Sequence, residues 1–205
     1  MNQNIEAKPK KRELTDRQYI AQQRRIDYRL PNIGFDFKQK LMQSYRDHLH
    51  HFDDHIQYAV TLQTNFVPAE RPSQREWQFK VLKENFTYFA NRLNAKIYKN
   101  GFKRKPDELS LLIIPVIQGA LFSPYGTRTL HYHVALGNVP PSYSDESLNR
   151  LIKGIWKTCA VARDDVLTKP AGPGWQDYIT AEVDEGHIEC VDYDNWNVPM
   201  KALSH

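Results

Sequence analysis

The chain has 205 residues, of which 40% are hydrophobic and 12% aromatic, and its formal net charge is +4. These values suit one medium domain with appendages and argue against wholesale disorder. The two cysteines, Cys159 and Cys190, have no clustered spacing, which argues against a disulfide framework and a thiolate zinc site. No apolar run approaches the roughly 20 residues of a membrane span, and the first residues lack the apolar centre of a signal peptide. We therefore expect a cytoplasmic protein that does not associate with membranes.

The positive charge is concentrated at the start of the chain. Residues 1–30 hold eight lysines and arginines against four acids, a surplus equal to the net charge of the whole chain. A basic arm on a near-neutral body is a common way to hold a polyanion, although a solvated tail explains the charge equally well. We expect a basic arm over residues 1–34, a domain over 35–200 and a short tail over 201–205.

Periodicity predicts the first elements of this domain. Apolar residues at spacings of three and four predict a helix over 35–54. Alternation over 56–66 predicts a half-buried strand. A long helix follows, for which Ser73 is the expected cap and Gly101 the expected end.

Two strands and a helix are expected next. The apolar run 109–117 predicts a buried strand, in which Pro115 indicates a sheet edge or a bulge. A second strand is expected over 129–136. Ser144 then opens a helix whose acidic first turn suits the helix dipole.

The last part of the domain has weaker patterns. A loop rich in Pro and Gly leads into a short helix expected to begin near Gly174, and residues 187–193 look like a strand. The order strand, helix, strand, strand, helix predicts an α+β fold. We expect a central antiparallel sheet of four or five strands with helices packed on it, as in ferredoxin-like folds.

The triplet His131–Tyr132–His133 lies in the second of the two adjacent strands. On a strand both histidines point to one face, about 6–7 Å apart at Cα, and can converge on one metal ion. A chance pair of surface histidines is the plain alternative. A cupin-like metal barrel fits poorly, because the triplet is followed by no acid until Asp145. The other histidine cluster, around His48, is expected to be a solvated helix surface.

Three segments in order resemble the HUH endonucleases, which include rolling-circle replication initiators, relaxases and single-strand transposases. Residues 58–66 resemble the strand of the first motif of that family, and residues 130–137 resemble its paired-histidine strand. Residues 174–182 resemble the helix that carries the tyrosine nucleophile. The resemblance covers about residues 55–200 and implies an antiparallel sheet with the metal on its face and the tyrosine helix alongside.

The resemblance implies a reaction and its residues. Tyr178 is the expected nucleophile, which attacks a DNA phosphate to leave a 5′-phosphotyrosyl enzyme; Tyr193 and Tyr143 are the alternatives. His131 and His133, with an oxygen ligand, suit Mn²⁺ or Mg²⁺.

The chain departs from the pattern of the family at two positions. The oxygen ligand is expected from Gln118, where relatives often have an acid, or from Glu182, one helical turn after Tyr178. The lysine that commonly follows the tyrosine by three residues is replaced by Ala181, for which Lys157 or Arg163 are candidate substitutes.

Other residues are candidates for contacts with DNA. Aromatic side chains stack on unpaired bases, and Trp77, Trp156 and Trp175 are candidates for this, although Trp156 suits a core better. Polar residues along the first strand and a basic turn are candidates for binding the backbone, although an exposed polar face or a charged loop explains them too: Thr61, Gln63, Asn65, Lys103, Arg104 and Lys105.

The expected function is metal-dependent nicking and strand transfer on single-stranded or hairpin DNA. Replication initiation or mobilisation of a mobile element, such as a plasmid or phage, is the expected setting, with a homo-oligomer or replication proteins as possible partners. The alternative is a catalytically impaired DNA-binding regulator on the same fold. An RNA-binding ferredoxin-like domain is remote, because the chain lacks the paired aromatic strand motifs of that group.

Overall fold

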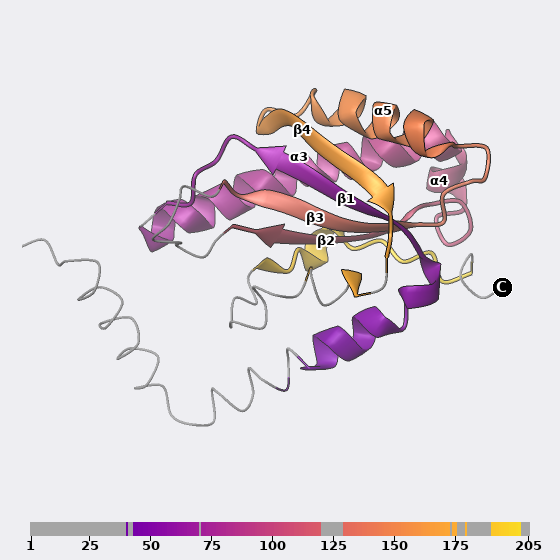
Figure 1. Cartoon of the computed structure of the whole chain (residues 1–205), viewed down its shortest axis with the longest axis horizontal. Coiled ribbons are helices and arrows are strands. Elements are labelled where there is room, and N and C mark those ends of the chain that lie inside the picture. Colours follow the sequence, from indigo (N-terminus) through magenta and orange to yellow (C-terminus); the bar gives the residue numbers. More distant parts are fainter. Residues whose placement is uncertain are drawn as a thin grey trace, which may run out of the picture. The chain divides into compact units, whose positions relative to one another are not determined.

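The computed structural model of this protein describes residues 40, 43–69, 71–119, 129–172, 174–175, 179 and 190–201 (Figure 1). The chain forms two compact units, Met1–Leu41 and Met42–His205. The expected basic arm, the short tail after Lys201, Tyr178, Ala181 and Glu182 lie outside the described residues. Residues 43–50 are helical, and the elements after them are η1 (Asp53–His55), β1 (Ile56–Thr64), α3 (Pro72–Tyr98), α4 (Gly101–Arg104), β2 (Leu112–Gln118), β3 (His131–Gly137), α5 (Asp145–Trp156), β4 (Ala162–Pro170) and η3 (Tyr193–Asn195).

The four strands form one antiparallel sheet in the order β2-β3-β1-β4. The predicted α+β fold with an antiparallel sheet and packed helices is therefore confirmed. The strand β3, which carries the histidine triplet, lies inside the sheet between β2 and β1. Pro115 lies on the outer strand β2. Proline has no N–H to donate, and an outer strand needs no hydrogen bond to another strand on the side that faces away from the sheet.

Helices α3 and α5 lie on one face of this sheet (Figure 1). Tyr132 points to this face, and its ring centre is 4.5 Å from that of Phe86 and 6.5 Å from that of Trp156. Trp156 is fully buried, and its Nε1 donates a hydrogen bond of 2.9 Å to the carbonyl of Gln63. Burying a large apolar side chain stabilises a fold by about 1.5–3 kcal/mol. Trp156 is therefore a core residue, as its surroundings in the sequence suggested.

The boundaries of the long helix differ from those predicted. Its N-cap is Arg71, with Pro72 as the first helical residue, so the predicted cap at Ser73 is wrong. Proline suits this position, because its fixed φ matches the helix and the first N–H groups have no partner within it. The helix ends at Tyr98, because Lys99 has a φ of 54°, and Gly101 begins α4 instead of ending α3.

The strand β4 was missed in the sequence. Its residues are mostly exposed, because it forms the outer strand of the sheet beyond β1. Its first half holds Arg163, Asp164 and Asp165, so it has no alternation of apolar and polar residues. Pairing with β1 is what makes this segment extended, since Val166 lies opposite Leu62.

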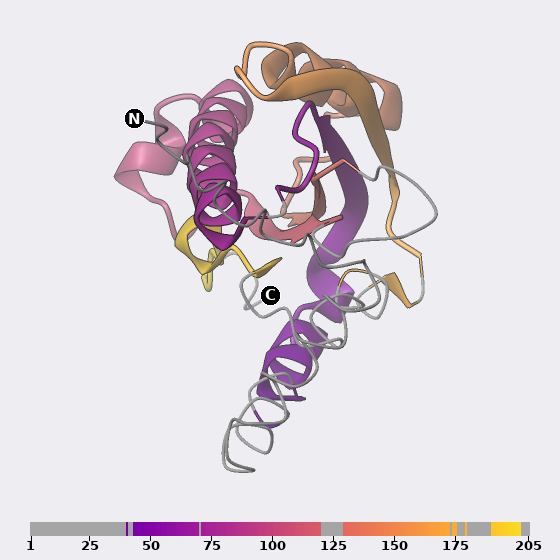
Figure 2. The ribbon, with the colours of Figure 1, turned by 90° about the vertical axis from the view of Figure 1, so that its left-hand side faces the viewer.

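The last described segment lies beside α3 (Figure 2) and contains no continuous strand. Of the predicted strand over 187–193, the first three residues lie outside the described ones. Val191 forms only an isolated bridge with Val116, and a 3-10 helix begins at Tyr193. Among the described residues, no helix combines the length and the apolar character needed to cross a membrane.

Candidate metal centre

The two histidines of the triplet lie on the sheet face opposite α3 and α5. His133 is paired with Thr61 on β1, and His131 is paired with both Gln63 on β1 and Gln118 on β2. Directly paired residues of antiparallel strands point to the same face. The register therefore places Thr61, Gln63 and Gln118 next to the histidine pair. The alternation in the sequence had predicted that the two histidines share one face of the sheet.

The two imidazoles point toward each other. Their Nε2 atoms are 3.1 Å apart, and their ring centres are 4.8 Å apart at nearly right angles. The Nδ1 of His131 is 2.9 Å from the carbonyl of Thr129, and the Nδ1 of His133 is 3.1 Å from the hydroxyl of Thr61. These contacts hold the pair from both sides, and His133 is buried, with only 2% of its surface exposed.

These contacts determine where the protons lie. A carbonyl only accepts, so the Nδ1 of His131 must carry a proton, and in the neutral tautomer its Nε2 then has a free lone pair. The Nε2 of His133 then donates to that lone pair, while its Nδ1 accepts from Thr61. If a cation replaced this proton, the Nδ1 of His133 would carry a proton and donate it to Thr61. Such an outer hydrogen bond is what orients a metal-binding imidazole in many proteins.

Burial strongly disfavours the charged form of His133. Desolvation, followed by the nearby His131 and the positive charge of Lys169, lowers the pKa of His133 from 6.5 to about 3. His133 is therefore neutral at physiological pH. A neutral imidazole is the form that binds metal ions, so a cation would not have to displace a stabilised imidazolium.

This pKa shift predicts a dependence of stability on pH. Because the pKa of His133 is lower in the folded state, the unfolded chain binds more protons between about pH 6.5 and pH 3. The free energy of unfolding, measured by urea titration with a chelator, should fall as pH falls through this window. The total loss should be a few kcal/mol, since one pKa unit corresponds to about 1.4 kcal/mol.

The matched comparison uses the exposed His51. His133→Asn should remove most of this pH dependence below about pH 6.5, whatever its effect on stability at neutral pH. His51→Asn should leave the pH dependence as it is, because His51 is exposed. Equal slopes in His133→Asn and the unchanged chain would contradict the assignment.

The spacing of the two histidines fits a bound metal ion. Two nitrogens each about 2.0–2.1 Å from one zinc ion lie roughly 3 Å apart when their angle is between the octahedral and tetrahedral values. The observed 3.1 Å agrees with this spacing. Among the described residues, no group of three or more His, Cys, Asp or Glu side chains could hold a metal ion. A third protein ligand must therefore be a different side chain or lie outside these residues, as Glu182 does.

Gln118 is such a different side chain. It is the last residue of β2, it lies opposite His131 and it is 7% exposed. Its Nε2 donates to the carbonyl of Ile179 at 3.1 Å, which orients the amide. Its Oε1 is an oxygen of the kind that binds divalent cations.

The segment around Tyr178 touches this site on both sides of the tyrosine. Ile179 accepts the hydrogen bond of Gln118. Trp175 is 8% exposed, and its ring stands edge-on to that of His133 with centres 5.5 Å apart. Trp175 is therefore a wall of the site rather than an exposed surface for stacking. Tyr178 itself lies outside the described residues.

We compared the chain with profiles of protein families, with curated proteins and with solved structures. No family profile, curated protein or solved structure matches the chain.

Gly119 allows the chain after the end of β2 to lie close to the chain before the start of β3. Its φ is +88°, and a Cβ atom there would lie 2.4 Å from the carbonyl of Thr129. This carbonyl is the acceptor for His131. A side chain at position 119 would therefore push away the group that sets the tautomer of His131.

The residues expected to contact DNA divide into two groups. Thr61 and Gln63 lie beside the histidines, where Thr61 binds His133 and Gln63 accepts from the hydroxyl of Thr129 at 3.1 Å. Asn65 follows β1 and is exposed. The basic residues 103–105 precede the start of β2, whereas Gln118 is the last residue of β2. The seven residues of this strand separate its two ends by about 20 Å. This turn does not contribute to the histidine site.

The alternative residues lie elsewhere or are occupied. Tyr193 lies edge-on to the ring of Tyr45 and tilted against that of Trp196, beside the long helix α3. Lys157 forms an ion pair of 3.2 Å with Asp164.

Lys169 is a residue that the sequence analysis missed. It lies on β4 opposite Ala59, two residues from Thr61, and is therefore on the histidine face. Its Nζ is 5.9 Å from the ring centre of Trp175. Only the assignment of β4 as a strand could have pointed to it, because side chains two residues apart on a strand share a face.

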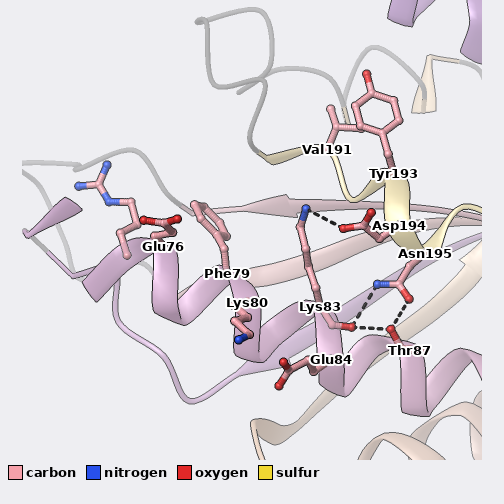
Figure 3. Close-up of a pocket in the computed structure, with 11 residues that line it drawn as sticks. Glu76, Phe79, Lys80, Lys83, Glu84, Thr87, Val191, Tyr193, Asp194 and Asn195 are labelled. Carbon is pink, nitrogen blue, oxygen red and sulfur yellow. Dashed lines mark hydrogen bonds and ion pairs between the residues drawn. The ribbon is translucent and has the colours of Figure 1, made fainter. Parts of the chain in front are cut away.

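A hollow of about 900 Å³ lies between α3 and the last described segment, away from the histidines (Figure 3). Four of its polar residues bind one another in pairs: Lys83 lies 3.7 Å from a carboxylate oxygen of Asp194, and Thr87 donates to Asn195 at 2.6 Å. Asn195 also donates to buried Asp192, which accepts from the hydroxyl of Tyr132 at 3.1 Å. These contacts attach the last segment to α3 and to the strand of the histidines.

Proposed function

We propose that this protein nicks single-stranded DNA by metal-dependent transesterification, with Tyr178 as the nucleophile. The observation that carries the proposal is the pair of Nε2 atoms, 3.1 Å apart on β3, with Gln118 beside them. The contacts of Trp175 with His133 and of Ile179 with Gln118 support the choice of Tyr178, since these two residues flank the tyrosine. The likeness of three segments to the HUH endonucleases supports the reaction type.

The residues of the site would have distinct roles in this reaction. His131, His133 and Gln118 would hold Mn²⁺ or Mg²⁺, with Glu182 as a further candidate ligand. The bound ion would neutralise charge on the scissile phosphate. Thr61 keeps the imidazole of His133 oriented through its 3.1 Å hydrogen bond.

The reaction balances without a further reactant. The phenolic oxygen of Tyr178 forms a bond to phosphorus, and the bond from phosphorus to the 3′ oxygen breaks. The tyrosine proton is lost to solvent and the 3′ oxygen gains one, which leaves a free 3′-hydroxyl and a 5′-phosphotyrosyl bond. Reversal of these steps joins strands, which suits replication initiation or the mobilisation of a mobile element.

The test is detection of the covalent product. The protein is incubated with Mn²⁺ and a pool of single-stranded and hairpin oligonucleotides, and digested peptides are analysed by mass spectrometry. We expect a nucleotide adduct on the peptide that contains Tyr178, and none with a chelator. If neither cleavage nor an adduct forms with any oligonucleotide, the proposal is wrong.

A DNA-binding regulator without cleavage is the second candidate. The absence of a carboxylate from the set Gln118, His131 and His133 favours it, because a site without a carboxylate holds a divalent cation more weakly. Ala181 in place of the lysine of the family favours it too. This candidate predicts affinity for DNA without any adduct.

A further inference from the structure

Among the described residues beside the histidine pair, Thr61, Gln63 and Gln118 carry no charge that would attract a phosphate. A phosphodiester carries a full negative charge, and binding of single strands depends largely on lysine and arginine. A lysine or arginine on the same sheet face would therefore strengthen binding of the backbone in addition to the proposed metal ion.

Lys169 occupies the appropriate position. On β4 it lies opposite Ala59, and the next residue on that face of β1 is Thr61, the partner of His133. Trp175 lies between Lys169 and His133, with its ring 5.5 Å from that of His133 and 5.9 Å from the Nζ of Lys169.

The side chain of Lys169 is also available. It is exposed, and 5.9 Å is near the limit of about 6 Å at which a cation still interacts with an aromatic face. That contact is weak for an exposed lysine, so the ammonium group can leave it for a phosphate oxygen. Lys157, in contrast, already pairs with Asp164.

We propose that Lys169 binds a phosphate of the single strand beside the histidine pair, supplying positive charge from β4. This inference rests on the proposed function, because it takes single-stranded DNA as the ligand. Lys169 would hold the backbone by its charge, while the histidines hold the metal ion.

The test measures binding without cleavage. The affinity of the full chain for a labelled single-stranded oligothymidylate is measured with a chelator over a range of salt concentrations. Lys169→Gln should weaken binding about two- to fivefold at low salt. The slope of log affinity against log salt should fall in magnitude by about 0.7, the value for one phosphate contact with a single strand.

Three comparisons make the test specific. Lys169→Arg keeps the charge and should restore the affinity. Lys153→Gln makes the same charge change on the exposed side of α5 and should have little effect. A neutral methylphosphonate strand should bind the unchanged chain and Lys169→Gln equally.

The outcomes separate the two proposals. If the unchanged chain binds or cleaves DNA but Lys169→Gln keeps its affinity and salt slope, the role of Lys169 is wrong and the proposed function stands. An equal loss in Lys153→Gln would also overturn the role of Lys169. If the unchanged chain binds no single strand, both proposals are wrong.

Discussion

Tyr178→Phe should abolish the covalent DNA adduct and reduce cleavage by about a thousandfold or more. Phenylalanine keeps the ring but lacks the oxygen that would bond to phosphorus, and loss of a nucleophile has effects of at least this size in other enzymes. The measurements are gel-based cleavage of a single-stranded substrate with Mn²⁺ and mass spectrometry of the peptide. Affinity for the strand should change little, because the charge of the protein is unchanged.

Tyr193→Phe is the matched control. It removes the same hydroxyl from a ring that is 48% exposed beside α3, in contact with Tyr45 and Trp196. Cleavage should persist in this variant. An adduct that persists in Tyr178→Phe would assign the reaction to another tyrosine. If the unchanged chain binds DNA and forms no adduct, the regulator without cleavage is the correct function.

Removing either histidine of the pair should nearly abolish metal binding. His131→Ala and His133→Ala should each lower the affinity for Mn²⁺ at least about a hundredfold, because changes in groups that merely orient ligands already cost 10–100-fold. Calorimetric titration with Mn²⁺ measures this directly. His131→Ala is the more informative variant, since His131 is only half-buried and its loss disturbs the fold less than that of His133.

The control for the metal experiment is again His51. It is an exposed histidine in the turn that follows the helical residues 43–50. His51→Ala should bind Mn²⁺ as the unchanged chain does. Thermal unfolding of each variant checks that the fold is kept. Retention of Mn²⁺ affinity in both His131→Ala and His133→Ala would show that the pair is not the metal site.

Much of the fold could be predicted because its elements have strong local patterns. The alternation over 56–66 and the apolar run before Gln118 predicted β1 and β2, and Ser144 is indeed the cap of α5, accepting from the N–H of Ser147 at 3.3 Å. The strand β4 could not be predicted, because an exposed outer strand has no apolar face. Its extended form depends on pairing with β1.

The site could be predicted only in part. The spacing of His131 and His133 was sufficient to place them on one face, because alternation is a local property of a strand. The direct pairing of Gln118 with His131 followed from the register between β2 and β3, which the sequence suggested only through a resemblance. Lys169 was missed because its strand was missed.

The sequence by itself determined the α+β architecture, the histidine pair on one sheet face and the core role of Trp156. Only the tertiary structure decided the tautomers of the histidines, the burial that lowers the pKa of His133 and the proximity of Lys169. The physical reason is the range of the interactions. Periodicity depends on residues a few positions apart, whereas hydrogen bonds and desolvation depend on strands that meet only after folding.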